Sequence, residues 1–597
     1  MTLELCGFKR KVDMFEINDE TKRLKSSCST RLEDLSNELI HEIFDYLDDW
    51  EIYELFFQMN IRFQLFFTSP NFRLKLNLPL TSKSMFHHRC IHLIKPNVDR
   101  IISLSLSHYL TTNDFLNSFS IDSFIHLERL NLIGVSSTNL ILLLTRLATL
   151  SRFVSLSITC IDNWKNAYVI YQCIFRLSTI KYCKLTFLNH GDRNPLPYAI
   201  DKQDQCQTLE YLIIDSWYSL SQINAVLTYT PRLTHLFCRI ASALCSNIAD
   251  GPAVLLHLTH LTVDFYQLSF DEFEIFLIQM SRQLIFLRLT VSCNGTFFSS
   301  DRWEQLILNH IPHLRIFDFQ YNMSPEYPIN DENLNFVPID QFISTFWSNR
   351  NWCFEYQYWP DNDDDELFPI VFYSTHPYRR KYYELIECID DEDIEIHSAS
   401  HLTIRQQMNT ITCSSHFPNI TKLTLNANFL DENGQFIRDI NRIISLSKLK
   451  YLLMDEQELR IDQLIELLTF TSNIHSLTFA QMFFLDFHSL SIEQTDMFHQ
   501  ISMKNKITEL NIEHGCTLEH LKFFVNLCPR LQHLTIGISE TSLESILKFL
   551  LSNKDSNLFS LRILNTNKET INEIIRREIL LENYSIEYEN SAIHLWW

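Results

Sequence analysis

Glycine is scarce in this chain, with 8 residues among 597. Loops that bring the backbone close to a phosphate or another ligand depend on glycine, so the scarcity leaves little room for such loops. The sequence also contains no G-x-S-x-G, no glycine-rich phosphate loop and no H-E-x-x-H motif. We therefore expect a binding protein that is not an enzyme and that uses no cofactor.

Basic residues are also in the minority. The chain has 50 Lys and Arg against 72 Asp and Glu, which gives a formal net charge of −22 at pH 7. Binding to nucleic acid depends on Lys and Arg that neutralise phosphates over a continuous surface, so this charge argues against a nucleic-acid partner. An acidic protein favours basic partners instead. We expect the ligand to be a protein, and a basic one.

Long apolar runs and paired cysteine motifs are absent as well. No uninterrupted apolar run approaches the ~20 residues that cross a bilayer, so we expect no membrane span. Residues 1–30 mix charges of both signs and lack the apolar core of a secretory signal, which predicts a flexible leader.

The 15 cysteines include no C-x-x-C, and Cys160, Cys183 and Cys238 lie in expected strands as small hydrophobes. Reduced thiols and a cytoplasmic or nuclear location are expected.

What the chain has in abundance is a repeat with a period of about 26 residues. The recurring unit is L-x-x-L-x-L, in which other apolar residues replace Leu. Between units the apolar spacing changes from a period of two to a period of 3.6, as at Leu220, Ile223 and Val226, so each unit is expected to be a strand followed by a helix. The units begin at Ile101, Leu127, Phe153, Ile180, Leu209, Leu233, Leu258, Leu284 and Leu314, and then at Ile420, Leu449, Ile474, Ile507, Leu531 and Leu558.

Capping residues mark where some of the expected helices begin. Ser269 with Glu272, and Thr541 with Glu544, have the spacing of capping boxes. The whole pattern resembles a leucine-rich-repeat solenoid, which implies an α/β fold with one strand and one helix per repeat in a curved array. The Asn or Cys that the family has three residues after the last apolar strand position is mostly missing here, Asn428 being an exception. Uneven curvature is therefore expected.

Residues 34–67 carry a different apolar pattern, one that is typical of three short helices. Ser36 is placed to cap the first helix. The apolar stripe is too large for so small a segment, and it therefore needs a partner. Its members recur at helical spacing on the three expected helices: Leu35, Leu39, Ile43, Phe44 and Leu47; then Ile52, Leu55, Phe56 and Met59; then Phe63, Leu65, Phe66 and Phe67.

This segment resembles an F-box. That family's pattern opens with Leu-Pro and continues with Glu-Leu, an Ile-Phe pair and a closing Leu, and it is matched here by Leu35, Glu38, Leu39, Ile43, Phe44 and Leu47. Ser36 stands in place of the usual Pro, and Phe63 stands where the family commonly has Trp. The resemblance implies a Skp-type adaptor as partner. The residues it assigns to the adaptor contact or its supporting core are Leu35, Leu39, Ile43, Phe44, Leu47 and Leu55.

An F-box next to a leucine-rich solenoid resembles the substrate receptors of Skp/cullin/F-box ubiquitin ligases. The resemblance implies that the adaptor connects the chain to a cullin while the solenoid holds a protein substrate, so that ubiquitin transfer by other subunits becomes effectively intramolecular. The alternative is a leucine-rich scaffold or inhibitor protein outside any ligase, whose first helices only cap the solenoid. A cap buries the apolar stripe, whereas a docking module leaves it accessible.

Residues 321–415 interrupt the repeats with aromatic and acidic side chains. Residues 353–358 alternate like a strand, and residues 370–373 are the expected hairpin partner. One interpretation is a binding ledge whose aromatic and acidic residues recognise a basic partner. The other is an irregular pair of repeats whose aromatics fill the core and whose acids form a solvated loop. The residues that the first interpretation assigns to the partner are Trp352, Tyr356, Tyr358, Asp363, Asp364 and Asp365.

Two groups of histidines invite comparison with metal sites. His235 and His260 occupy the same position in successive repeats, which predicts stacking ~5 Å apart on the concave face, where they could contact a partner. No third ligand at fixed spacing accompanies them, so we expect no metal there. The second group matches no standard zinc spacing and is expected to lie on an amphipathic helix before Pro96: His87, His88, Cys90 and His92.

The sequence thus predicts six parts. They are a flexible leader (1–30), an F-box (31–70), a helical linker (71–98), the first half of the repeats (99–320), an aromatic and acidic insert or irregular repeats (321–415), and the second half of the repeats with a C-terminal cap (416–597).

Overall fold

Two units make up the computed structural model, residues 1–67 and residues 68–597. The residues that the structure describes are 34–44, 49–57, 59, 61–69, 72–161, 167–187, 199, 204–241, 255–280, 282–292, 296–322, 339–360, 367–375, 382–385, 397, 399–404, 416–426, 435–455, 458–481, 483–485, 493, 495–538, 540–552, 557–564, 566, 568–578, 584–589 and 592–597. The expected flexible leader and Asn428 lie outside these ranges.

Three short helices form the first unit, as the sequence predicted: α1 (Asn37–Phe44), α2 (Asp49–Phe56) and α3 (Ile61–Thr68). Ser36 caps α1, because its Oγ accepts a hydrogen bond from the Leu39 N–H at 3.4 Å. The core consists of side chains that are almost completely buried: Ile40, Phe44, Trp50, Ile52 and Phe63. Phe56 packs between two of these rings, with centroids 5.1 Å from Phe44 and 5.4 Å from Phe63.

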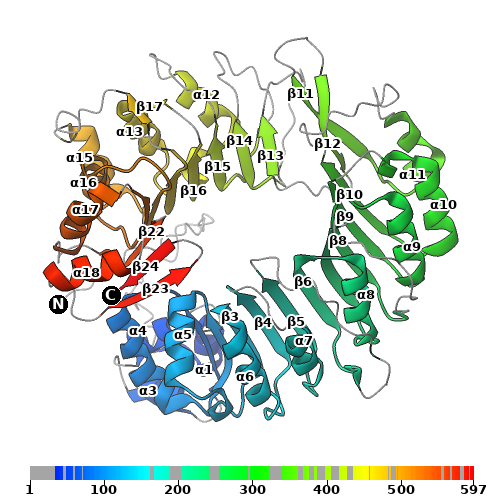
Figure 1. The fold of residues 1–597 in the computed structure, drawn as a ribbon, viewed down its shortest axis with the longest axis horizontal. Coiled ribbons are helices and arrows are strands. Elements are labelled where there is room, and N and C mark those ends of the chain that lie inside the picture. The colour runs from blue at the N-terminus through cyan, green and yellow to red at the C-terminus, as the bar shows by residue number, and fades with distance from the viewer. Residues whose placement is uncertain are drawn as a thin grey trace, which may run out of the picture. The chain divides into compact units, whose positions relative to one another are not determined.

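The second unit contains a 12-stranded sheet in the order β1-β2-β3-β4-β5-β6-β7-β8-β9-β10-β12-β11 (Figure 1). Neighbours are parallel from β1 to β10, and the last two strands are antiparallel. The strands are β1 (Leu74–Leu78), β2 (Ile101–Leu106), β3 (Arg129–Val135), β4 (Ser155–Cys160), β5 (Tyr182–Phe187), β6 (Tyr211–Tyr218), β7 (His235–Ala241), β8 (His260–Tyr266), β9 (Phe286–Ser292), β10 (Ile316–Asn322), β11 (Phe354–Pro360) and β12 (Leu367–Ser374).

A 10-stranded sheet follows in the order β13-β14-β15-β16-β18-β20-β21-β22-β24-β23, and β17 (Glu458–Arg460) pairs separately with β19 (Phe483–Leu485). The strands are parallel except the last two, β24 and β23. They are β13 (Tyr382–Leu385), β14 (His401–Ile404), β15 (Lys422–Leu425), β16 (Tyr451–Met454), β18 (Ser476–Phe479), β20 (Glu509–Ile512), β21 (His533–Gly537), β22 (Ser560–Leu564), β23 (Ser585–Glu589) and β24 (Ala592–Trp596).

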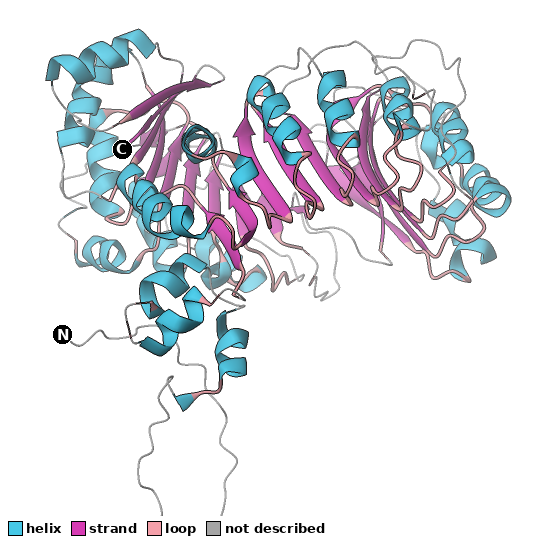
Figure 2. Ribbon diagram, turned by 90° about the horizontal axis from the view of Figure 1, so that it is seen from below, coloured by secondary structure: helices cyan, strands magenta, loops and turns pink. Residues whose placement is uncertain are grey.

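Helices lie on the outer face of both sheets, and the strands line the inner face (Figures 1 and 2). None of the helices in the described ranges has both the length and the apolar character that crossing a membrane requires. The helices are α4 (Lys83–Arg89), α5 (Tyr109–Ser118), α6 (Ser137–Leu147), α7 (Ala167–Phe175), α8 (Leu220–Thr228), α9 (Phe270–Met280), α10 (Ser300–His310), α11 (Thr345–Ser348), α12 (Gln435–Ile443), α13 (Ile461–Phe470), α15 (Asp496–Lys504), α16 (Leu518–Leu527), α17 (Glu540–Ser552) and α18 (Lys568–Glu578).

The predicted repeats form columns of buried side chains that run across the strands. The second apolar position of each unit pairs in register with the same position of the next unit, because a shift of one residue would turn every such side chain to the opposite face. The columns are Leu104, Leu130, Leu156, Cys183, Leu212, Leu236, Leu261, Leu287 and Phe317 in the first sheet, and Leu423, Leu452, Leu477, Leu510, Leu534 and Leu561 in the second; all are buried. The α/β solenoid of strand and helix units is thus observed.

The boundaries of the array differ from the prediction. Strand β1 lies within residues 71–98, which the sequence analysis assigned to a helical linker, and it pairs with β2 as a full member of the sheet. Its residues LKLNL alternate but lack the first Leu of the repeat unit, so the repeat pattern does not identify them as a strand of the array. The second sheet likewise begins inside the predicted insert 321–415, with β13 and β14. The helix predicted before Pro96 is present as α4 and a following π turn.

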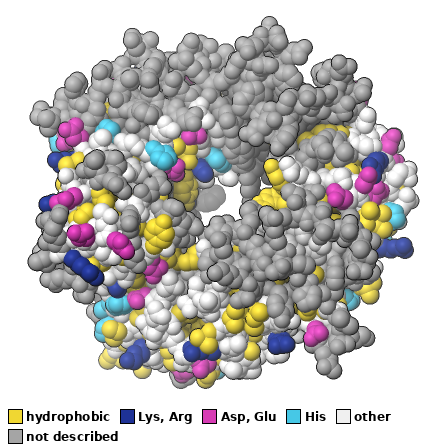
Figure 3. Space-filling view, viewed as in Figure 1, with side chains coloured by type: hydrophobic (Ala, Val, Ile, Leu, Met, Phe, Trp, Pro, Cys, Tyr) yellow, Lys and Arg dark blue, Asp and Glu magenta, His cyan; other side chains and the backbone are white. Residues whose placement is uncertain are grey.

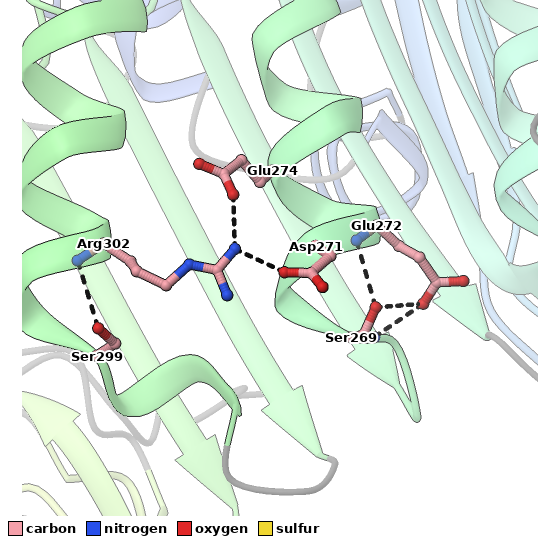
Figure 4. Close-up of polar contacts among 6 residues, drawn as sticks. All are labelled: Ser269, Asp271, Glu272, Glu274, Ser299 and Arg302. Atoms are coloured by element: carbon pink, nitrogen blue, oxygen red, sulfur yellow. Dashed lines mark hydrogen bonds and ion pairs between the residues drawn. The ribbon is translucent and has the colours of Figure 1, made fainter.

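Neighbouring repeats are also joined on the outer face, as between α9 and α10 (Figure 4). Ser269 and Glu272 form the predicted capping box: the Ser269 N–H donates to Glu272 Oε2 at 3.0 Å, and the Glu272 N–H donates to Ser269 Oγ at 3.3 Å. Arg302 Nη2 of α10 lies 2.6 Å from both Asp271 and Glu274 of α9. The capping box predicted at Thr541 is wrong, since α17 begins at Glu540 and Thr541 lies inside it.

Cysteine labelling tests this packing. Cys160, Cys183 and Cys238 are buried in strands as expected, whereas Cys353 is exposed at the start of the β11 hairpin. Burial raises the pKa of the Cys183 and Cys238 thiols, so little reactive thiolate forms. We expect iodoacetamide to label Cys353 of the native protein at least about 10-fold faster than these three thiols, as measured by peptide mass spectrometry. Equal rates in the native protein would contradict the buried positions.

Candidate functional site

The first candidate site is an apolar surface on the three-helix unit. Five apolar residues of this unit are about half exposed or more, and we call them the apolar face. Their exposed fractions are 47% for Leu39, 55% for Leu55, 50% for Met59, 73% for Ile61 and 66% for Leu65. The unit therefore divides its apolar residues between a small core and this face. Exposed apolar side chains that gather in one small unit mark a binding surface more often than a folding requirement.

A hydrogen-bonded arginine joins the helices that carry the apolar face. Arg62 of α3 donates from Nη2 to the Leu35 carbonyl oxygen and to Asn37 Oδ1, each at 2.7 Å. This contact fixes the start of α1 against α3, and Leu39 follows one turn later on α1. The hydrogen bonds of Arg62 thus hold α1 and α3 together without using the apolar side chains of the apolar face.

The six residues predicted for the adaptor contact fall into four groups. Leu39 and Leu55 are exposed, and Leu35 and Ile43 are partly buried. Phe44 is buried, so it belongs to the supporting core and not to the surface. Leu47 lies outside the described residues. Ile61 was missed because it begins α3 and lies outside the helical stripe that the sequence pattern used.

A second candidate site is a stack of rings on the concave face, the strand face opposite the helices. Five rings in adjacent strands β5 to β9 share one register position: Tyr182, Tyr211, His235, His260 and Phe286. The His235 and His260 ring centroids lie 4.1 Å apart at an interplanar angle of 13°, which confirms the predicted stacking. Tyr211 lies 4.1 Å from His235, and Phe286 lies 5.6 Å from His260. Burial, followed by the neighbouring His260, lowers the pKa of His235.

Alternating charges run beside this stack in a row that sequence reasoning missed. Lys184, Asp215, Arg239, Asp264, Arg288 and Asp318 lie on the six strands β5 to β10, and together we call them the charge row. Arg239 lies 3.0 Å from Asp215 and 3.3 Å from Asp264, and Arg288 Nε lies 2.8 Å from Asp318 Oδ2. The sequence does contain a pattern that could have revealed the charge row, because each of its residues lies one or three positions after the second apolar position of its repeat unit.

Around the concave face the space-filling view shows an opening at the centre (Figure 3). On the concave face the stack has partly exposed aromatic and imidazole rings, and the charge row has ion pairs of which Asp318 is buried. Since the acids and bases of the row alternate, they neutralise one another and leave a surface without one dominant sign. Such a surface suits contacts with a protein better than contacts with a polyanion.

The hairpin predicted in the insert is present, but its tryptophan is not an anchor for a partner. Strands β11 and β12 pair antiparallel as expected. Trp352 is 3% exposed and its indole N–H donates to the Arg315 carbonyl oxygen at 3.3 Å, so it is a core residue and the ledge interpretation is wrong for it. The Tyr356 and Tyr358 side chains lie outside the described part of the structure, as do Asp363, Asp364 and Asp365.

The histidines before Pro96 make separate contacts. His87 Nε2 lies 2.6 Å from Asp114 Oδ2, and the His88 and His92 rings are 4.3 Å apart. Cys90 is buried, and burial raises the pKa of its thiol to about 12. Within the described ranges, no group of three or more His, Cys, Asp or Glu residues could hold a metal ion.

Comparison with known proteins gives no assignment of family. No family model matches the chain, and no curated protein matches it. Among solved structures, a leucine-rich-repeat protein of Leptospira interrogans is similar with 12% identity and a TM-score of 0.25, covering 81% of this chain and 100% of its own. The TLR13–ssRNA13 complex is similar with 14% identity and a TM-score of 0.19, and the match covers 69% of this chain and 46% of that one. The repeating strand and helix architecture follows from the register of the repeats themselves.

Proposed function

We propose that this chain is an F-box substrate receptor. It docks on a Skp-type adaptor, and through the adaptor on a cullin, while its leucine-rich solenoid holds a protein for ubiquitination in the cytoplasm or nucleus. The observation that supports this proposal is the exposure of the apolar face, with Leu39 and Leu55 about half exposed.

The mechanism follows from binding alone. Burial of the apolar face against the adaptor supplies the driving force, at about 25 cal/mol for each Å² of apolar surface removed from water. The solenoid then holds its protein ligand close to the other subunits, which raises the effective concentration of the ligand's lysines for ubiquitin transfer. The chain contributes position and no reacting group.

The ligand of the solenoid is proposed to be a protein that contacts the concave face. The ring stack, including His235 and His260, offers flat side chains of the kind that dominate protein interfaces. The formal net charge of −22 favours a basic ligand through long-range attraction. The charge row is self-neutralising, so selectivity for a basic ligand would come from the whole protein's field and not from that row.

Co-expression of the full chain with a Skp-type adaptor tests the proposal. We expect the two proteins to elute together from a size-exclusion column as a one-to-one complex, with a Kd below about 1 µM by calorimetry. Full-length protein is required because β1 belongs to the sheet, and a fragment ending near residue 100 would separate it from its array. Failure of the folded chain to bind any such adaptor would leave the leucine-rich scaffold as the function.

A further inference from the structure

The two ends of the second unit are in direct contact. The C-terminal hairpin β23–β24 meets the chain just before and within α4. The Lys83 N–H donates to the Trp597 carbonyl oxygen at 3.0 Å, and the Trp596 indole N–H donates to the Thr81 carbonyl oxygen at 2.6 Å. Lys83 Nζ also donates to Ser585 Oγ at 2.7 Å. We call the contact of β23–β24 with α4 and α5 the seam.

The seam has fewer contacts than the junctions between paired strands within each sheet. Within each sheet, neighbouring strands are joined by backbone hydrogen bonds along several residues, whereas among the described residues no strand pair joins β11 of the first sheet to β13 of the second. The seam relies on a few bonds and on Trp596, whose ring lies 5.7 Å from that of Phe86. It also closes a loop of about 500 residues, which costs conformational entropy. The seam is therefore held by fewer contacts than a pair of neighbouring strands within either sheet.

A buried histidine lies inside the seam. His594 of β24 is 6% exposed, and among the residues that the structure describes neither of its ring nitrogens has a hydrogen-bond partner. The ring centroids of Tyr109 and His108, at the start of α5, lie 5.1 and 6.0 Å from it. In the two adjacent strands it pairs in register with Arg562 and Glu587.

The charged groups around His594 disfavour a proton on its ring. Arg562 on β22 is cationic, and a protonated His108 would add a second positive charge on the other side of the seam. Glu587 is the nearby acid on β23, but its carboxylate accepts a hydrogen bond from Asn113 Nδ2 at 3.2 Å. Further along the sheet, the charge of His533 on β21 also lowers the pKa of His108, and Glu509 pairs in register with His533.

We propose that the seam is a proton-operated clasp, in which protonation of His594 and His108 releases the C-terminal hairpin from α4 and α5 and opens the solenoid. Opening would let a protein chain reach the concave face from the side. The clasp needs no other ligand, and it stands independently of adaptor binding by the first unit.

The direction of the pH response follows from the two histidines. Burial, with Arg562 and His108 adding to it, lowers the pKa of His594 from 6.5 to about 3, and burial with His533 and Arg562 lowers the pKa of His108 to about 4. An open seam hydrates both rings and returns their pKa values toward 6.5. The open state therefore binds more protons, and the closed state loses stability as the pH falls below 6.5. Between pH 7.5 and 5.5 the opening equilibrium should rise about 10-fold for each histidine.

Hydrogen exchange at the Lys83 amide measures the opening. This N–H is at the first position of α4, where it has no partner in its own helix, so its protection comes from the Trp597 carbonyl across the seam. In full-length protein we expect protection of the peptide 79–86, corrected for the intrinsic rate, to fall about 100-fold from pH 7.5 to 5.5. A peptide covering β8 should keep its protection over the same range.

Variants separate the clasp from general acid sensitivity. His594→Phe keeps a ring of similar size, and His108→Asn keeps an acceptor for the Leu110 N–H at the helix cap. Each variant should reduce the pH-dependent loss of protection about 10-fold, and the double variant should abolish nearly all of that loss. His475→Asn, at an exposed site away from the seam, should respond like wild type. The proposal is overturned if the 79–86 peptide keeps its protection at pH 5.5, if β8 loses protection in step with it, or if both variants leave the response unchanged.

Discussion

Leu39→Asp is expected to weaken binding of the Skp-type adaptor by about 100-fold while leaving the fold intact. Leu39 is about half exposed on α1, so the carboxylate can remain hydrated in the free protein and should change its stability little. In the complex the same carboxylate would be buried against an apolar partner without a compensating charge. Calorimetric titration of purified adaptor into the full-length variant measures the loss.

The solenoid offers a matched control for this substitution. Leu142 is also a helical leucine, on α6, and its exposed fraction of 56% is close to that of Leu39. Leu142→Asp introduces the same charge on the second unit and should leave adaptor affinity unchanged. Wild-type affinity in Leu39→Asp, or equal losses in both variants, would remove the apolar face from the adaptor interface.

Arg288→Ala is expected to lower the free energy of unfolding by about 3 kcal/mol, because it removes the positive charge from beside a buried carboxylate. The Asp318 side chain is completely buried, and its Oδ2 lies 2.8 Å from Arg288 Nε. The Ser374 hydroxyl, at 3.5 Å from Oδ1, remains as a weaker donor. Urea denaturation followed by circular dichroism, compared through transition midpoints, measures the change.

Two further variants isolate that cause. Arg239→Ala removes a guanidinium from the same row, but its partners Asp215 and Asp264 are each more than a fifth exposed, so the loss should stay below about 1 kcal/mol. Adding Asp318→Asn to Arg288→Ala removes the buried negative charge and should recover most of the stability. Equal losses for Arg288→Ala and Arg239→Ala would show that burial of Asp318 is not the cause.

The repeat architecture was predictable because its signal is local and periodic. Alternation along a strand and the 3.6-residue period of a helix are properties of short segments, and fifteen units in sequence reinforce one another. The same reasoning placed His235 and His260 side by side, since residues at equal positions in adjacent parallel strands must be neighbours. It also predicted the β11–β12 hairpin from two alternating segments.

Other features lay beyond such local rules. Strand β1 has the alternation of a strand without the spacing of the repeat, and only its pairing with β2 identifies it as a repeat. Trp352 follows a pattern that suits either a core or a binding surface, and its burial against Phe317 decides in favour of the core. The complete burial of Asp318 beside Arg288 is decided by packing, because equal repeat positions predict that the two residues are neighbours but not how much of either is exposed.

By itself, the sequence determined the strand and helix units of the fifteen recognised repeats, their register and the three helices at the start of the chain, because apolar periodicity selects which face of each element is buried. Tertiary structure decided which apolar side chains stay exposed, as Leu39 and Leu55 do while Phe44 is buried, and it brought Lys83 to Trp597 across the seam. Exposure and end-to-end contact depend on how elements pack in three dimensions. No local pattern encodes the distance between residues that are about 500 positions apart.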